Sequence, residues 1–157
     1  MSNHDATTSK PACPDIDDRG LPAGYPFKPA YEVCPSSART MLADGQAILV
    51  DVRLAEEREI ATLPGGHDEI HAPLHELNDH LDDIEDLARG RTILTFCHHG
   101  IRSIKAALAL RGCGMDDSHS IAGGIDVWSM GVDTSVPRYT RDGAQCQVVP
   151  AGSPQGA

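Results

Sequence analysis

The sequence predicts an α/β fold: a small parallel sheet of about five strands with helices on both faces. Continuous apolar runs at 48–52 and 93–96 indicate strands that are covered on both faces. A segment rich in strong helix formers follows the second run at 104–111 and stops at Gly112. Strands that alternate with helices in this way are typical of βαβ units, and βαβ units build parallel sheets.

Length and composition permit one domain with tails. The chain has 157 residues, of which 40% are hydrophobic and 23% charged, which suffices for a single core. We expect an irregular proline-rich arm at 1–30, the domain at 31–139 and a flexible tail at 140–157. Three aromatic residues of this first part are candidates for packing back on the domain: Tyr25, Phe27 and Tyr31.

Charge and cysteine usage limit the partners and the compartment. The formal net charge is -10, which argues against nucleic acid and anionic membranes as partners, because phosphate groups demand basic patches. No apolar run is long enough to span a bilayer, and the chain opens on a polar stretch, so we expect a cytoplasmic protein. Five cysteines without a CxxC pair suit a reducing compartment with free thiols.

The first elements of the domain follow from local signals. An edge strand is expected at 31–33, and Pro35 begins a helix that ends before Gly45, with Cys34 at its N-cap. The run at 48–52 is a strand buried on both faces. A short helix at 54–60 carries a run of charges that we interpret as a solvated face.

The later elements are predicted in the same way. Apolar residues recur every three or four positions at 74–87 and predict one amphipathic helix, closed by Gly90, with an acidic outer face. A strand is expected at 118–121, and Trp128 is expected to pack in the core from a short helix. Charged residues at 68 and 69 weaken the signal for a further strand after the turn at 63–66.

Four histidines raise the question of a metal site: His67, His71, His75 and His80. Histidines four apart on one helix share a zinc ion in many proteins. Pro73 breaks any helix between the second and third of them. We therefore expect loop histidines and no metal.

The chemistry is expected in the stretch 97–103, which joins the second buried strand to the following helix. Cys97 lies where that strand ends, beside a helix N-terminus that favours negative charge. Cysteine reacts as the thiolate, and Arg102 supplies a fixed positive charge nearby. Gly100 allows a turn in which successive N–H groups point inward as an anion-binding nest. His98 and His99 add imidazoles, which ordinarily titrate near neutral pH.

Asp51 and Arg53 end the first buried strand at the same edge of the sheet as Cys97. An Asp and an Arg at this spacing can form an ion pair. We expect them to support the site rather than to take part in the chemistry.

Four motifs in order resemble the rhodanese-like sulfurtransferases, over residues 31–139. The loop from Cys97 to Arg102 has six residues, as in that family. The "DVR…EE" segment at 51–57, the Pro-Gly turn at 63–66 and the Gly-Gly…Trp signature at 122–128 are similar to the family's other motifs. The resemblance implies the rhodanese fold and sulfur transfer through a persulfide.

The resemblance also implies roles for residues. Cys97 is the expected nucleophile, and the rest of the loop binds the substrate: His98, His99, Gly100, Ile101, Arg102 and Ser103. It implies no cofactor and no metal. The expected partners are a small-molecule sulfur donor, such as thiosulfate or a persulfide, and a thiol or cyanide acceptor. A sulfur-accepting protein is the further partner that we consider.

Three alternatives stay open at this point. A phosphatase of the related fold uses the same cysteine and arginine, but with a longer loop sized for phosphate. A delivery module carries sulfur to a biosynthetic protein without turning over free thiosulfate well. A purely structural module lacks a reactive cysteine, and Cys97 beside Arg102 argues against it.

Overall fold

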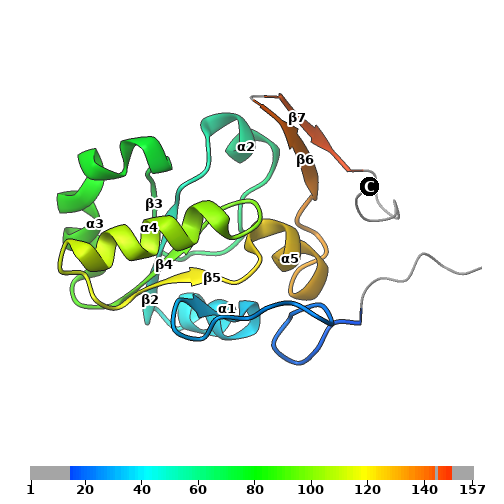
Figure 1. Cartoon of the computed structure of the whole chain (residues 1–157), viewed down its shortest axis with the longest axis horizontal. Helices are drawn as coiled ribbons and strands as arrows, with labels where there is room; N and C mark the ends of the chain where they lie inside the picture. The colour runs from blue at the N-terminus through cyan, green and yellow to red at the C-terminus, as the bar shows by residue number, and fades with distance from the viewer. Residues whose placement is uncertain (1–14, 144, 150–157) are drawn as a thin grey trace, which may run out of the picture.

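A five-stranded parallel sheet carries the fold (Figure 1). The computed structural model describes residues 15–143 and 145–149. The strand order is β1-β5-β4-β2-β3, and every pairing is parallel. The strands are β1 (Glu32–Val33), β2 (Ala47–Asp51), β3 (Glu69–His71), β4 (Thr92–Phe96) and β5 (Ser118–Ile121). The predicted fold class is confirmed, and the strand after the Pro-Gly turn is present as β3.

Helices cover both faces of the sheet. One core packs α1 (Pro35–Ala43) and α5 (Gly124–Gly131) on one face, and includes Trp128. The other core packs α4 (Ile101–Gly112), α3 (Leu81–Ala88) and the 3₁₀ segment η1 (Leu74–His80) on the opposite face. Residues of β2 alternate between the two cores, because successive side chains of a strand point to opposite faces. None of the described helices has the length and apolar character needed to cross a membrane.

Two helices differ from their predicted form. The single helix expected at 74–87 is divided into η1 and α3, and His, Asn and Asp, which are weak helix formers, make up most of the second half of η1. Helix α4 starts at Ile101, three residues earlier than expected. Gly100 is its N-cap and has a φ of 103°, so the turn of the loop leads directly into the helix.

Residues 15–30 fold against the domain. Leu21 is fully buried beside Ala122 and Val127, and Tyr25 and Phe27 pack against the same cluster. Within the described part of this arm, the β-structure consists of one isolated bridge between Ile16 and Pro22. Tyr31 stays 39% exposed, so two of the three candidate aromatic residues pack back on the domain.

The segment after residue 139 forms a hairpin, whereas a flexible tail was expected from 140. Strand β6 (Tyr139–Asp142) pairs antiparallel with β7 (Gln145–Val148). Gly143 follows β6 with a φ of 59°, and a glycine with positive φ is a common signal at the first position of a hairpin turn. The tail beyond 149 lies outside the described residues.

Candidate active site

Hydrogen-bond donors converge on the sulfur of Cys97. This residue directly follows β4 and is 1% exposed. The backbone N–H of Gly100 donates to Sγ at 3.0 Å, and that of Ser103 donates at 3.3 Å. The Ser103 hydroxyl lies 3.2 Å from the sulfur, 3.2 Å from the carbonyl oxygen of Gly100 and 2.7 Å from the Ser120 hydroxyl, so its one proton can go to the sulfur or to that carbonyl while Ser120 donates to Ser103. This arrangement, at the N-terminus of a twelve-residue helix, favours a negative charge on the sulfur.

The N-terminus of α5 holds the opposite side of the loop. The N–H groups of Ile125 and Asp126 donate to the carbonyl oxygens of Cys97 and His98 at 2.9 and 3.1 Å. A Cβ at Gly124, where φ is 64°, would collide with the same two carbonyl oxygens. Because these carbonyls point to α5, other N–H groups of the loop can point to the sulfur.

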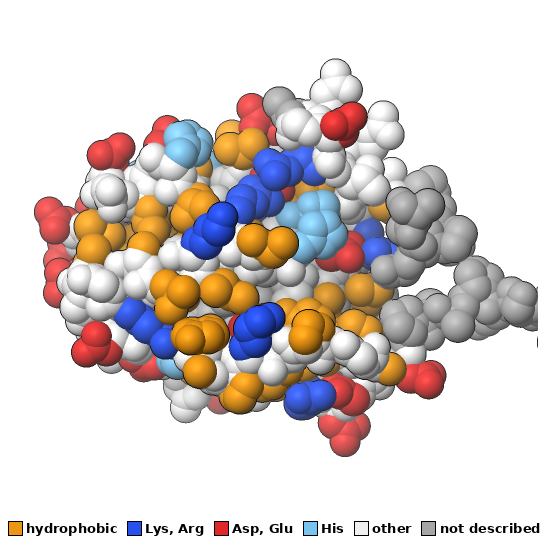
Figure 2. Space-filling model, in the orientation of Figure 1, with side chains coloured by type: hydrophobic (Ala, Val, Ile, Leu, Met, Phe, Trp, Pro, Cys, Tyr) orange, Lys and Arg blue, Asp and Glu red, His pale blue; other side chains and the backbone are white. Residues whose placement is uncertain are grey.

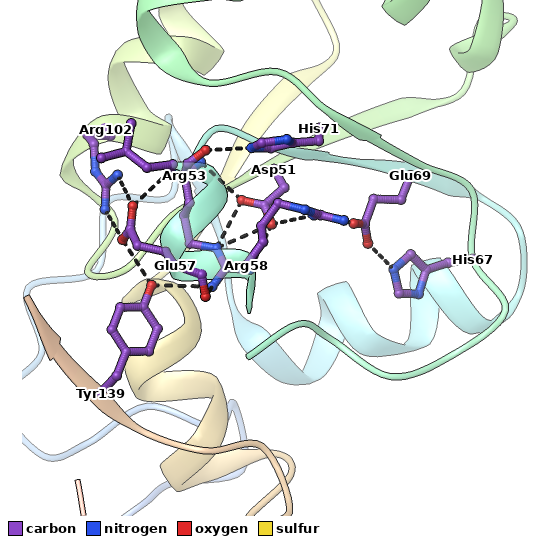
Figure 3. A network of polar contacts seen from close by, with 10 residues as sticks. Asp51, Arg53, Glu57, Arg58, His67, Glu69, His71, Arg102 and Tyr139 are labelled. Carbon is purple, nitrogen blue, oxygen red and sulfur yellow. Dashed lines mark hydrogen bonds and ion pairs between the residues drawn. The ribbon is translucent and has the colours of Figure 1, made fainter. Parts of the chain in front are cut away.

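Arg102 pairs with a buried carboxylate. Its Nη1 and Nη2 donate to the two oxygens of Glu57, each at 2.7 Å, and Glu57 is fully buried (Figure 3). Burial alone would raise the pKa of Glu57, but hydrogen bonds from Arg102 and from the backbone of Leu54 outweigh it and hold the pKa at about 2. The fixed positive charge that Arg102 was expected to supply near Cys97 therefore has a permanent counter-ion. The prediction that the charged side chains at 54–60 form a solvated face is therefore wrong for Glu57.

Asp51 and Arg53 form the expected ion pair. Their Oδ2 and Nη2 atoms are 2.7 Å apart, and both side chains are buried. Arg53 Nη1 also donates to the hydroxyl of Tyr139 at 3.2 Å, and that hydroxyl donates to Glu57 at 2.9 Å. Figure 3 shows these side chains joined in one network that reaches from the end of β2 to Arg102. Asp51 and Arg53 are therefore linked to Arg102 of the loop through Tyr139 and Glu57.

His98 and His99 lie in opposite environments. His98 is buried, and its ring stacks on Tyr139 with centroids 4.1 Å apart. Its Nε2 lies 2.7 Å from the carbonyl oxygen of Tyr139, and it carries the proton because a carbonyl only accepts. Burial, with a further contribution from His99, lowers the pKa of His98 to about 4. The expectation that His98 titrates near neutral pH is therefore wrong. The side chain of His99 is 60% exposed and lies 3.9 Å from Asp126.

Comparison with known families agrees with this geometry. The model of the rhodanese-like domain matches residues 35–130, which is more than half of the chain. The chain belongs to the rhodanese-like family. The matched region contains strands β2 to β5, the Cys97 loop and α5 up to residue 130, whereas β1, the arm and the hairpin lie outside it.

Individual relatives cover a wider range of named proteins. A human single-domain sulfurtransferase is 26% identical with a TM-score of 0.51, and the match covers 65% of this chain and 96% of that one. A thiosulfate sulfurtransferase from Pseudomonas aeruginosa is 22% identical with a TM-score of 0.55, covering 64% of this chain and 19% of that one. A tRNA uridine(34) hydroxylase from Brucella ovis is 31% identical over 93 residues. The latter match spans 59% of this chain and 30% of the relative's length.

Sequence reasoning missed three residues that support this rhodanese-like loop. Glu57 lies within the "DVR…EE" motif, but its partner Arg102 lies 45 residues later in the chain. Tyr139 had no local signal, because its partners Glu57 and Arg53 lie more than eighty residues away in the chain. Tyr25 donates to the buried Glu32 at 2.6 Å, and its hydroxyl lies 3.8 Å from the position that a Cβ on Gly100 would take.

The other candidate groups lie apart from the loop or are otherwise engaged. His67 contacts Glu69 at 3.0 Å, and His71 contacts the carbonyl oxygen of Arg53 at 2.7 Å. Among the described residues, no group of three or more His, Cys, Asp or Glu side chains is placed to hold a metal ion. Four cysteines are free thiols in the described ranges: Cys34, Cys97, Cys113 and Cys146.

Proposed function

We propose that this domain is a sulfurtransferase that carries sulfane sulfur as a persulfide on Cys97. The Cys97 thiolate attacks the outer sulfur of thiosulfate or of a persulfide. The sulfur–sulfur bond of the donor breaks, and sulfite or a thiolate leaves with the electron pair. A nucleophilic acceptor then attacks the outer sulfur of the Cys97 persulfide, and Cys97 leaves as the thiolate.

The convergence of donors on one sulfur carries this proposal. Gly100 N, Ser103 N and Ser103 Oγ all lie within 3.3 Å of Cys97 Sγ. These donors stabilise the thiolate before attack and again when Cys97 leaves in the second step. None of the steps requires a metal or an organic cofactor.

The same geometry weighs against phosphate ester hydrolysis. The backbone donors of the loop contact the sulfur itself, and the loop spans six residues from Cys97 to Arg102. A tetrahedral phosphate in line for attack needs donors spaced around its own oxygens, and a misplacement of about 1 Å costs on the order of a hundredfold in rate.

The conversion of thiosulfate and cyanide to thiocyanate tests the proposal. We expect turnover by the wild type, none by Cys97→Ser, and wild-type turnover by Cys113→Ser, which removes an exposed thiol instead. Aryl phosphate hydrolysis should be negligible. Phosphatase turnover that depends on Cys97 would overturn the assignment. If the wild type takes up sulfur but forms thiocyanate poorly, the delivery module becomes the better description.

A further inference from the structure

A mixed apolar and basic surface adjoins the Cys97 loop. We define the α4 face by Ile101, Lys105 and Leu108, together with Arg141 on β6. Figure 2 views the molecule from the side on which α4 lies in front, and there Lys and Arg side chains lie among hydrophobic ones near the centre. Most acidic side chains visible in this view lie towards its margin.

The apolar part of the α4 face is unusually exposed. Ile101 is 69% exposed and Leu108 is 43% exposed, and they are two of the four large hydrophobic side chains that are exposed in the described ranges. Ile101, Lys105 and Leu108 follow one another at spacings of four and three, so they form one stripe along the helix. A partner that covers this stripe removes its apolar surface from water and so gains affinity.

The charge of the α4 face is opposite to that of the whole chain. Lys105 is exposed, and the side chain of Arg141 is 32% exposed, in a chain with a net charge of -10. A local positive region on an acidic protein steers acidic partners to that region and repels them elsewhere. Because the region adjoins Ile101, an acidic partner that docks there reaches the Cys97 loop.

We infer that the α4 face docks a protein partner whose acidic side chains flank a cysteine, so that the sulfur donor or acceptor of this domain is a protein thiol or persulfide. The inference rests on the proposed function and specifies its substrate class. A protein fits better than a nucleic acid because the face exposes isoleucine and leucine.

Binding can be measured apart from chemistry with two synthetic peptides. Each has about ten residues with one central cysteine, enough to cover the roughly 10 Å from Ile101 to Leu108 along the helix. One peptide has aspartate and leucine around the cysteine, and the other has lysine and leucine. We expect the backbone amide NMR signals of α4 to shift when the acidic peptide is added, both in the wild type and in Cys97→Ser. The basic peptide should shift them much less.

Two variants outside the loop test the contacts. Lys105→Glu should weaken the acidic peptide about tenfold and strengthen the basic one, and Leu108→Ser should weaken the acidic peptide about threefold. Arg89→Glu makes the same charge change at the end of α3, ahead of β4, and should leave binding unchanged. The persulfide form of the acidic peptide should transfer sulfur to Cys97, and the variants should slow this transfer in the same order as they weaken binding. Transfer from thiosulfate to Cys97 should be the same in Leu108→Ser as in the wild type.

The outcomes separate this inference from the proposed function. The docking face would be overturned, and sulfur transfer left standing, if Cys97 takes up sulfur from thiosulfate but the protein binds both peptides equally. The same holds if Lys105→Glu does not change peptide binding. Acidic-peptide binding on α4 without any loading of Cys97 would support the face and count against sulfur transfer. The inferred protein partner would also be overturned by tighter binding of a single-stranded RNA than of the acidic peptide. Self-association through α4, measured by sedimentation, would overturn it as well.

Discussion

The hydroxyl of Tyr139 joins two charged and buried groups, and its removal tests how the hairpin stabilises the loop. It donates to Glu57 Oε1 at 2.9 Å and accepts from Arg53 Nη1 at 3.2 Å. Burial raises the pKa of Tyr139 beyond its ordinary range, so the hydroxyl keeps its proton at any pH of interest. Tyr139→Phe deletes both hydrogen bonds and retains the ring that stacks on His98.

The cost follows from the partners that remain. Hydrogen bonds to charged groups contribute about 1.5–3 kcal/mol each. Glu57 keeps the bidentate contact with Arg102, and Arg53 keeps its ion pair with Asp51, so part of the loss is recovered. We therefore expect the free energy of unfolding to fall by about 2 kcal/mol in Tyr139→Phe, which corresponds to a decrease of about 4–8 °C in Tm.

Urea unfolding measures this difference. The slope of the transition should stay at the wild-type value, because the surface exposed on unfolding hardly changes. Tyr31→Phe is the matched control: Tyr31 is 39% exposed, and we expect a change within about 0.5 kcal/mol. If Tyr139→Phe unfolds within about 0.5 kcal/mol of the wild type at an unchanged slope, the network of Figure 3 does not contribute to stability as argued.

Two further predictions concern the charged and titrating groups beside the loop. Since the folded-state pKa of His98 is about 4 and its ordinary value is 6.5, the stability due to its neutral form is present above pH 6.5 and declines as pH falls towards 4. Between pH 7 and pH 5, the free energy of unfolding of His98→Gln should therefore fall by about 2 kcal/mol less than that of the wild type. That of His99→Gln should fall as in the wild type. The same pH dependence in all three proteins would contradict the burial of His98. Arg102→Ala leaves Glu57 buried without its bidentate partner and should cost about 3–5 kcal/mol in urea unfolding, of which the double variant with Glu57→Gln should recover a substantial part. If the double variant recovers none of this free energy of unfolding, the unpaired charge of Glu57 is not the cause of the loss.

The features that sequence could predict are those encoded by adjacent residues. The buried runs that became β2 and β4 predicted the sheet, and the position of Cys97 after the second run placed it at the carboxyl edge. Gly100 predicted the turn that brings N–H groups to the sulfur. Each of these signals lies within a few residues of the feature that it predicts.

The errors concern contacts between distant parts of the chain. The carboxylate at Glu57 belongs to a charged run, and its burial depends on Arg102 and Tyr139, which lie 45 and 82 residues away. The environment of His98 is likewise set by Tyr139, 41 residues later. No local pattern contains that information. The hairpin after Tyr139 is different, because its turn signal, Gly143, lies within the hairpin itself.

The most direct test of sulfur transfer is the mass of the intact protein after treatment with thiosulfate, followed by peptide mapping. We predict one added sulfur atom on the wild type, located on Cys97, and released when cyanide or a thiol is added. Cys113→Ser should acquire the sulfur to the same extent, and Cys97→Ser should acquire none. A wild type that stays unmodified, or a Cys97→Ser variant that gains sulfur as the wild type does, would contradict the assignment of Cys97 as the sulfur carrier.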